Sequence, residues 1–88
     1  MSDPRYLRKG LGFAVGRVVE ECGELGAALG KTMRWGRDSF NPELPESERE
    51  TNEAWVRREI ADVREALDNL EAEMDKPRKF NDDMRVRP

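Results

Sequence analysis

The sequence predicts an all-α protein, in which an antiparallel helical hairpin assembles with further copies of itself into a homo-oligomer resembling a four-helix bundle. Two long stretches carry apolar residues at alternating spacings of four and three, which is the period of a packed helix face. One connection of about ten residues joins them, and a link this short favours antiparallel neighbours. The chain has 88 residues, 36% hydrophobic and 40% charged, so a single domain with a thin core needs a partner copy.

The first helix is predicted to run from Leu11 to about Trp35, with Gly36 as its C-terminal cap. Its apolar stripe consists of Leu11, Val15, Val18, Cys22, Leu25 and Leu29. Cys22 lies within this stripe, and we therefore expect it in the core rather than as a nucleophile. Residues 1–10 are interpreted as an arm or a separate short helix, because glycines interrupt the helical pattern at its end.

The connection is predicted to occupy residues 37–46, and a second helix is predicted to begin at Ser47. Ser47 and Glu50 have the spacing of a capping box, in which each side chain binds the backbone N–H of the other residue. The next N-cap candidate, Thr51, has Ala54 at the matching position, so the earlier start is preferred.

The second helix is predicted to repeat the pattern of the first. Its stripe consists of Val56, Ile60, Val63, Leu67, Leu70 and Met74. Pro77 ends the helix, because proline cannot continue it, and residues 77–88 are interpreted as a second arm or short helix. A single domain thus covers residues 1–88, with its core at about residues 11–76 and with the two stripes facing each other.

The composition excludes several classes of function. There is no histidine, which removes Ser-His-Asp and Cys-His nucleophiles and histidine-based zinc sites. The single cysteine, Cys22, allows no internal disulfide and suits a reducing compartment. A net charge of −3 with mixed signs argues against a nucleic-acid polymer as partner, and no apolar run approaches the ~20 residues of a membrane span. We therefore expect a soluble cytoplasmic protein that binds neither.

Two pairs of acidic residues occupy corresponding places on the two predicted helices. Glu21 and Glu24 flank the first stripe, and alanines on the same flank leave open space beside them. Glu59 and Asp62 flank the second stripe in the same way. Four carboxylates beside a core repel one another unless a cation binds them, and an all-oxygen set suits Mg²⁺ or Mn²⁺. The alternative is that they are surface acids paired with Arg17, Lys31, Arg58 or Arg64.

These acids also carry a resemblance to a known family. Residues 20–24 (E-E-C-G-E) and 59–62 (E-I-A-D) are similar to the E-E-x-x-E … E-x-x-D signature of the MazG-like pyrophosphohydrolases. That family belongs to the all-α nucleoside triphosphate pyrophosphohydrolase superfamily. Residues 34–36 (R-W-G) and 39–45 (S-F-N-P-E-L-P) resemble the short versions found in phage and bacterial genomes.

The resemblance implies hydrolysis of a nucleoside triphosphate to the monophosphate and pyrophosphate. It also implies that Mg²⁺ is bound by the acids that match the family's ligands, which are Glu21, Glu24, Glu59 and Asp62. Carboxylate-held Mg²⁺ reverses the sign of the site for an anionic triphosphate and activates a bound water. Because there is no histidine, an acid must accept or orient the proton of this water, and Glu20 and Glu21 are the catalytic candidates.

The substrate further requires cations for its phosphate oxygens and an aromatic platform for its base. The predicted substrate-binding residues are Lys31, Arg34, Trp35, Trp55, Lys79 and Asn81. The last two of these follow the family, whose members often use a lysine or asparagine late in the chain. The alternative for the basic residues is solvated charge near a helix C-terminus, and for the tryptophans it is packing at an interface.

Two other functions stay open. The first is a non-enzymatic helical-hairpin module that dimerises, with its acids serving only as surface charge. The second is a metal-binding relative that has lost turnover, because the segment after Met74 is shorter than the helices that close the pocket in longer family members. In each case a homodimer or homotetramer is expected, and the nucleotide base and sugar are not specified.

Overall fold

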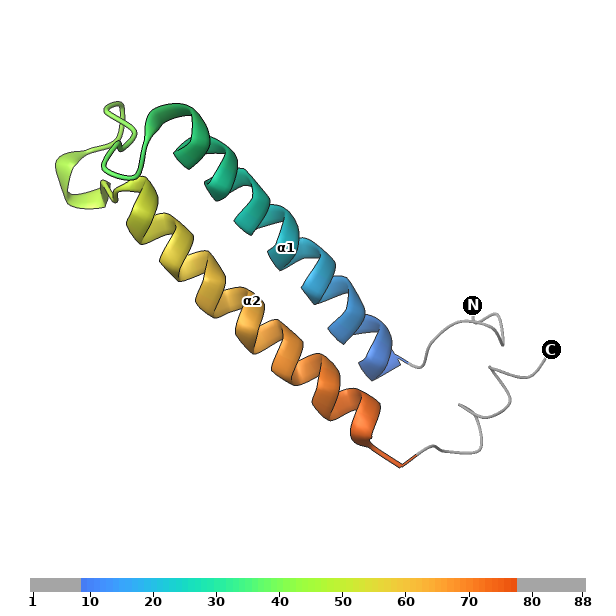
Figure 1. The fold of residues 1–88 in the computed structure, drawn as a ribbon. Helices are drawn as coiled ribbons and strands as arrows, with labels where there is room; N and C mark the ends of the chain where they lie inside the picture. Colours follow the sequence, from blue (N-terminus) through green and yellow to red (C-terminus); the bar gives the residue numbers. More distant parts are fainter. Residues whose placement is uncertain (1–8, 78–88) are drawn as a thin grey trace.

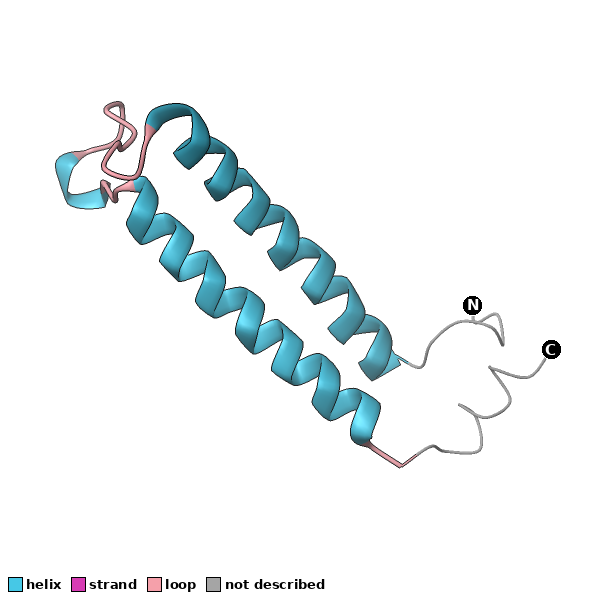
Figure 2. Ribbon diagram, viewed as in Figure 1, coloured by secondary structure: helices cyan, strands magenta, loops and turns pink. Residues whose placement is uncertain are grey.

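The computed structural model describes residues 9–77, which form two long antiparallel helices joined by a loop at one end (Figure 1 and Figure 2). Helix α1 spans Lys9–Trp35, a short 3-10 helix η1 spans Glu46–Glu48, and helix α2 spans Asn52–Asp75. Residues 9–77 contain no strand, so the predicted all-α hairpin is confirmed. Within this part of the chain, neither helix combines the length and hydropathy that a membrane span requires.

Most of the two predicted arms lies outside the described residues, which exclude residues 1–8 and 78–88. The sequence prediction places Lys9 and Gly10 in the first arm, whereas the structure includes both in α1. The assembly of several hairpins into a bundle stays a prediction.

The C-terminus of α1 is closed by Gly36 and by a side chain from the start of α2. Gly36 has a φ of +89°, the left-handed conformation that glycine tolerates best, and its N–H donates to the carbonyl of Thr32 at 2.8 Å. The Asn52 side-chain amide donates to the carbonyl oxygens of Gly36 at 2.8 Å and Lys31 at 3.4 Å. The predicted cap at Gly36 is therefore present, and Asn52 ties the two helix ends together.

The predicted start of the second helix at Ser47 is wrong. Helix α2 begins at Asn52 with Thr51 as its N-cap, whose hydroxyl accepts a hydrogen bond from the N–H of Ala54 at 3.1 Å. An N-cap needs only a backbone N–H two or three residues on, so the alanine at position 54 is no obstacle. The Glu50 carboxylate binds Arg58 at 2.6 Å instead of capping Ser47.

The most buried residues of both helices recur every seven positions. They are Ala14, Glu21 and Ala28 on α1, and Asn52, Glu59 and Ala66 on α2. A repeat of seven is the spacing that keeps one line of residues facing a partner helix. These two rows form the contact between the helices, and we call them the seam.

The predicted apolar stripes flank this contact instead of forming its centre, so the expectation that they face each other directly is wrong. Stripe members such as Leu25, Ile60 and Leu70 are partly buried beside the seam. At about 100° per residue, the stripes are rotated by roughly 60–80° from the seam. Cys22, predicted to lie in the core, is exposed in the described hairpin. The reason is steric: alanines let two helix backbones approach closely, and the larger stripe residues then lie beside the seam rather than within it.

The hairpin consequently has two different sides. Both stripes are rotated from the seam in the same sense along the chain, and in an antiparallel pair this brings them to one side of the molecule. We call it the apolar side; its exposed members are Val15, Cys22, Leu29, Leu67 and Met74. Exposure reaches 65% at Met74, which is high for a large apolar residue.

The bridge made by Asn52 leads to a stability prediction. In Asn52→Ala, the carbonyl oxygens of Gly36 and Lys31 lose a donor inside the structure. We expect the variant to lose about 1 kcal/mol in free energy of unfolding, which is the usual net contribution of a hydrogen bond, because both bonds are only partly buried. Urea denaturation at one fixed protein concentration measures this.

The matched control is Asn69→Ala, which removes an exposed asparagine of the same helix. We expect it to stay within about 0.5 kcal/mol of the wild type. Equal stability of the two variants would show that the Asn52 bridge contributes nothing.

Candidate metal centre

Two acidic residues occupy the middle of the seam. Glu21 is 9% exposed and Glu59 is 3% exposed. Each has a buried residue seven positions before and after it, and three of these four neighbours are alanines. Short alanine side chains bring the helices together without filling the space beside the carboxylates. The buried carboxylates are thus a consequence of the same repeat that packs the hairpin.

A group of three acids spans the two helices at this point. One carboxylate oxygen from each of Glu21, Glu59 and Asp62 lies within 4.8 Å of the others. Oxygen ligands around one Mg²⁺ stand about 2.1 Å from the ion, so opposite ligands are separated by about 4.2 Å. Small side-chain adjustments would therefore allow the three oxygens to bind a single cation.

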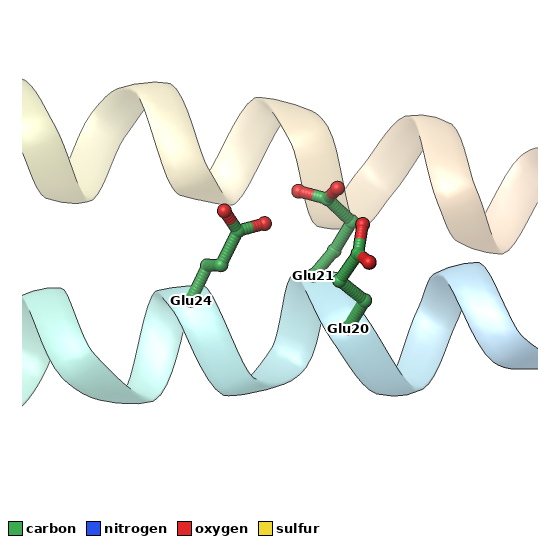
Figure 3. Close-up of side chains that lie close together, drawn as sticks. All are labelled: Glu20, Glu21 and Glu24. Atoms are coloured by element: carbon green, nitrogen blue, oxygen red, sulfur yellow. The ribbon is translucent and has the colours of Figure 1, made fainter.

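A second group of three acids lies on α1 alone and shares Glu21 with the first. Figure 3 shows Glu20, Glu21 and Glu24 extending from α1 toward the side on which α2 lies, and an oxygen of each is within 4.8 Å of the others. Glu20 and Glu24 are exposed, whereas Glu21 is buried. The four predicted metal ligands are thus divided between two adjoining groups with Glu21 in common.

The Glu59 carboxylate has an unusual hydrogen-bonding state. Its Oε2 accepts a hydrogen bond from Arg58 Nη1 at 3.1 Å. Its Oε1 is buried and has no hydrogen-bond partner within the described part of the chain. A buried carboxylate oxygen without a partner costs free energy, and most buried polar atoms in folded proteins have at least one hydrogen-bond partner. This oxygen distinguishes the group from ordinary surface acids, which are hydrated.

The pKa of Glu21 also indicates that an ionised carboxylate is unfavourable in the seam. Burial raises the pKa of the Glu21 carboxyl above its ordinary value, and the negative charges of Glu24 and Asp62 raise it further. Arg17 acts in the opposite direction without cancelling the effect. The ionised carboxylate of Glu21 is therefore unfavourable in the metal-free fold, and a bound cation would offset this cost.

The predicted substrate-binding residues are spread over the hairpin. Trp55 is half-buried and lies one turn before Glu59 on α2, next to the acids. Lys31 is exposed and lies seven residues beyond Glu24, about 10 Å along the helix. Arg34 and Trp35 are exposed and lie farther still, at the end of α1. Of the four predicted substrate-binding residues that lie within residues 9–77, Trp55 alone is within one turn of the acids.

The other two predicted substrate residues, Lys79 and Asn81, lie outside the described residues. Two arginines near the acids were considered in the sequence only as surface partners. Arg58 does pair with Glu59, but it binds a single oxygen of that carboxylate. Arg17 pairs instead with Glu65 across the two helices at 2.8 Å. The alternative that the four acids are surface residues paired with basic side chains therefore fits Glu59 only in part, because one oxygen of its carboxylate has no partner among the described residues.

In comparisons with known proteins, no family model, curated protein or solved structure matches this chain. The resemblance to MazG-like pyrophosphohydrolases consequently rests on the two acidic motifs and their helical setting.

The raised pKa of Glu21 leads to a prediction about pH. The ionised carboxylate destabilises the metal-free fold above the folded-state pKa, and this destabilisation disappears as the carboxyl takes up a proton on acidification. We expect metal-free Glu21→Gln to melt at a higher temperature than the wild type at neutral pH. The difference should shrink as the pH falls through the folded-state pKa of Glu21. Thermal unfolding in a chelator across a pH series measures it.

Glu71→Gln, an exposed acid of α2, is the control that removes the same charge away from the seam. Its melting temperature should differ little from that of the wild type at any pH. A lower melting temperature for Glu21→Gln at neutral pH would contradict the electrostatic account of the seam.

Proposed function

We propose that this chain is a Mg²⁺-dependent nucleoside triphosphate pyrophosphohydrolase, which converts a ribo- or deoxyribonucleoside triphosphate and water to the monophosphate and pyrophosphate. The observation that carries the proposal is the buried, unpartnered Oε1 of Glu59, which belongs to a carboxylate grouped with Glu21 and Asp62. The agreement of both acidic motifs with the family signature supports the reaction class.

The donor atoms favour Mg²⁺ or Mn²⁺ over softer metals. All nearby ligand atoms are carboxylate oxygens, and the chain contains no histidine. Glu21, Glu59 and Asp62 would hold one ion, and Glu24 with the shared Glu21 would hold a second. When bound, the metal supplies charge for the triphosphate and a water of lowered pKa.

The protein's own acids have to move the proton of that water. Glu20 and Glu21 are the residues we assign to this step, as in the sequence prediction. The raised pKa of Glu21 belongs to the metal-free protein, and a bound cation would lower it, whereas Glu20 is exposed and open to solvent. Trp55, one turn from Glu59, is suited to stack against the base of the substrate.

The proposal includes a homodimer or homotetramer. Val15, Leu29 and Leu67 are exposed on the apolar side of the hairpin, and a second copy would remove them from water. Among the described residues, only alanines are fully buried apolar side chains, and the larger members of the stripes keep part of their surface in water. A cytoplasmic location and the absence of nucleic-acid and membrane partners belong to the same proposal.

The exposed apolar side also favours the second candidate, a non-enzymatic module that binds through this surface. That alternative makes no use of the grouped carboxylates. Metal binding and pyrophosphate release therefore separate the two functions.

The enzymatic proposal is tested with a panel of nucleoside triphosphates and Mg²⁺, by measuring pyrophosphate and monophosphate. We expect Glu59→Gln to lower the rate at least about 100-fold, since even residues that only support a metal ligand contribute about 10- to 100-fold. Glu71→Gln removes the same charge from an exposed position of α2 and should keep the wild-type rate. No pyrophosphate from any nucleotide, at enzyme levels where a known pyrophosphohydrolase reacts, would refute the proposal.

The oligomer is tested by placing a charge on the apolar side. Leu67→Glu should convert the wild-type oligomer to a smaller species, because a carboxylate at a closed apolar interface is strongly unfavourable. Ala61→Glu is the control: Ala61 is exposed and lies two residues after Glu59, on the opposite side of α2 from the seam. Light scattering after size exclusion gives the masses. A wild type that is already monomeric would exclude this interface.

A further inference from the structure

Arg58 lies between two acids and binds both. Its Nη2 donates to Glu50 Oε1 at 2.6 Å and its Nε to Glu50 Oε2 at 3.5 Å. Its Nη1 donates to Glu59 Oε2 at 3.1 Å. The guanidinium is a rigid planar fork, so a carboxylate that binds one edge of it fixes where the remaining N–H groups point.

The contact with Glu59 determines how that carboxylate is turned. A carboxylate with one oxygen held by a donor cannot rotate freely, so the position of its second oxygen is fixed as well. In Glu59 the second oxygen, Oε1, is the buried atom without a partner. Arg58 thus leaves one oxygen of this buried carboxylate available, within the group formed with Glu21 and Asp62.

Glu50 gives Arg58 both its place and its charge balance. The Arg58 side chain is 53% exposed, so without an anchor it is free to leave Glu59 for solvent. Glu50 precedes the N-cap of α2 and holds the guanidinium from outside the helix. Because the Glu50 charge offsets that of Arg58, the pair adds little net positive charge beside a site meant for a cation.

We propose that Arg58, anchored by Glu50, is the positioning residue that orients the Glu59 carboxylate toward a divalent cation. The inference rests on the metal site of the proposed function. Residues that hold a metal ligand in its binding orientation typically contribute about 10- to 100-fold to metal affinity. An arginine that acted merely as a competing cation would have the opposite effect, since its removal would strengthen metal binding.

The test is titration of the full-length protein with Mn²⁺ alone, followed by calorimetry or by the electron spin resonance of the free ion. We expect Arg58→Gln to weaken Mn²⁺ binding about 10- to 100-fold. Glu50→Gln should weaken it by a smaller factor, because without its anchor Arg58 contacts Glu59 only part of the time. Arg58→Lys preserves the charge without the planar fork, and we expect it to bind Mn²⁺ nearly as weakly as Arg58→Gln.

Arg57→Gln is the matched control. Arg57 is the preceding residue of the same helix and forms an exposed ion pair with Glu53 at 3.0 Å. The substitution therefore removes the same charge and breaks an ion pair without touching Glu59. We expect its Mn²⁺ affinity to stay within about twofold of the wild type, the scale of an exposed pair.

Mn²⁺ binding by Arg58→Gln that equals or exceeds that of the wild type would overturn the proposal, as would wild-type affinity in Arg58→Lys. Circular dichroism checks that the variants remain helical. If Arg58→Gln does not fold, Glu50→Gln decides, and unchanged affinity in that variant overturns the proposal. A wild type that binds no Mn²⁺ is a separate result, since it removes the metal site and with it the proposed function.

Discussion

The hairpin depends on a contact between two helices that places negative charge where apolar side chains normally lie. The apolar residues buried among residues 9–77 are Ala14, Ala28 and Ala66, and the largest side chains in the seam are glutamates. Alanine burial removes little area from water, so most of the hydrophobic stabilisation of an isolated hairpin comes from partly buried residues beside the seam, such as Leu25, Ile60 and Leu70. Two further contributions would raise the stability of the fold. They are neutralisation of the buried carboxylates and coverage of the apolar side.

The residues concerned lie on different surfaces. Glu20, Glu24 and Asp62 lie to one side of the seam, and the two apolar stripes lie to the other. The ion pair between Arg17 and Glu65 crosses the helices on the acidic side and contributes modestly, because both side chains are hydrated. A partner copy on the apolar side would thus leave the carboxylates open to a ligand.

The sequence predicted which residues share a helix face but not how that face is turned. Gly36 and Pro77 mark helix ends through backbone chemistry that is local, and the spacing of the acids placed them on the inner flank of each helix. Which flank meets the other helix depends on how closely the two backbones approach. The small alanines allow the closest approach, so they lie in the seam and the larger apolar residues lie beside it. The N-cap at Thr51 was missed because Glu50, expected to cap Ser47, pairs with Arg58 eight residues ahead. The pairing of Arg58 with Glu59 was foreseen only as a surface alternative, without the role of Glu50 in holding Arg58.

The repeat of seven on both helices has a consequence for alignment. Since Glu21 and Glu59 are neighbours in an antiparallel pair, the same repeat sets Ala14 beside Ala66 and Ala28 beside Asn52. Sliding one helix by a single repeat, about 10 Å, would again match small residues with seam positions while moving the two glutamates apart. Packing alone thus discriminates weakly between registers, and charge repulsion opposes the observed one, whereas the hydrogen bonds from Asn52 to Gly36 and Lys31 favour it. A cation shared by both helices would remove the repulsion and favour the same register at the middle of the hairpin.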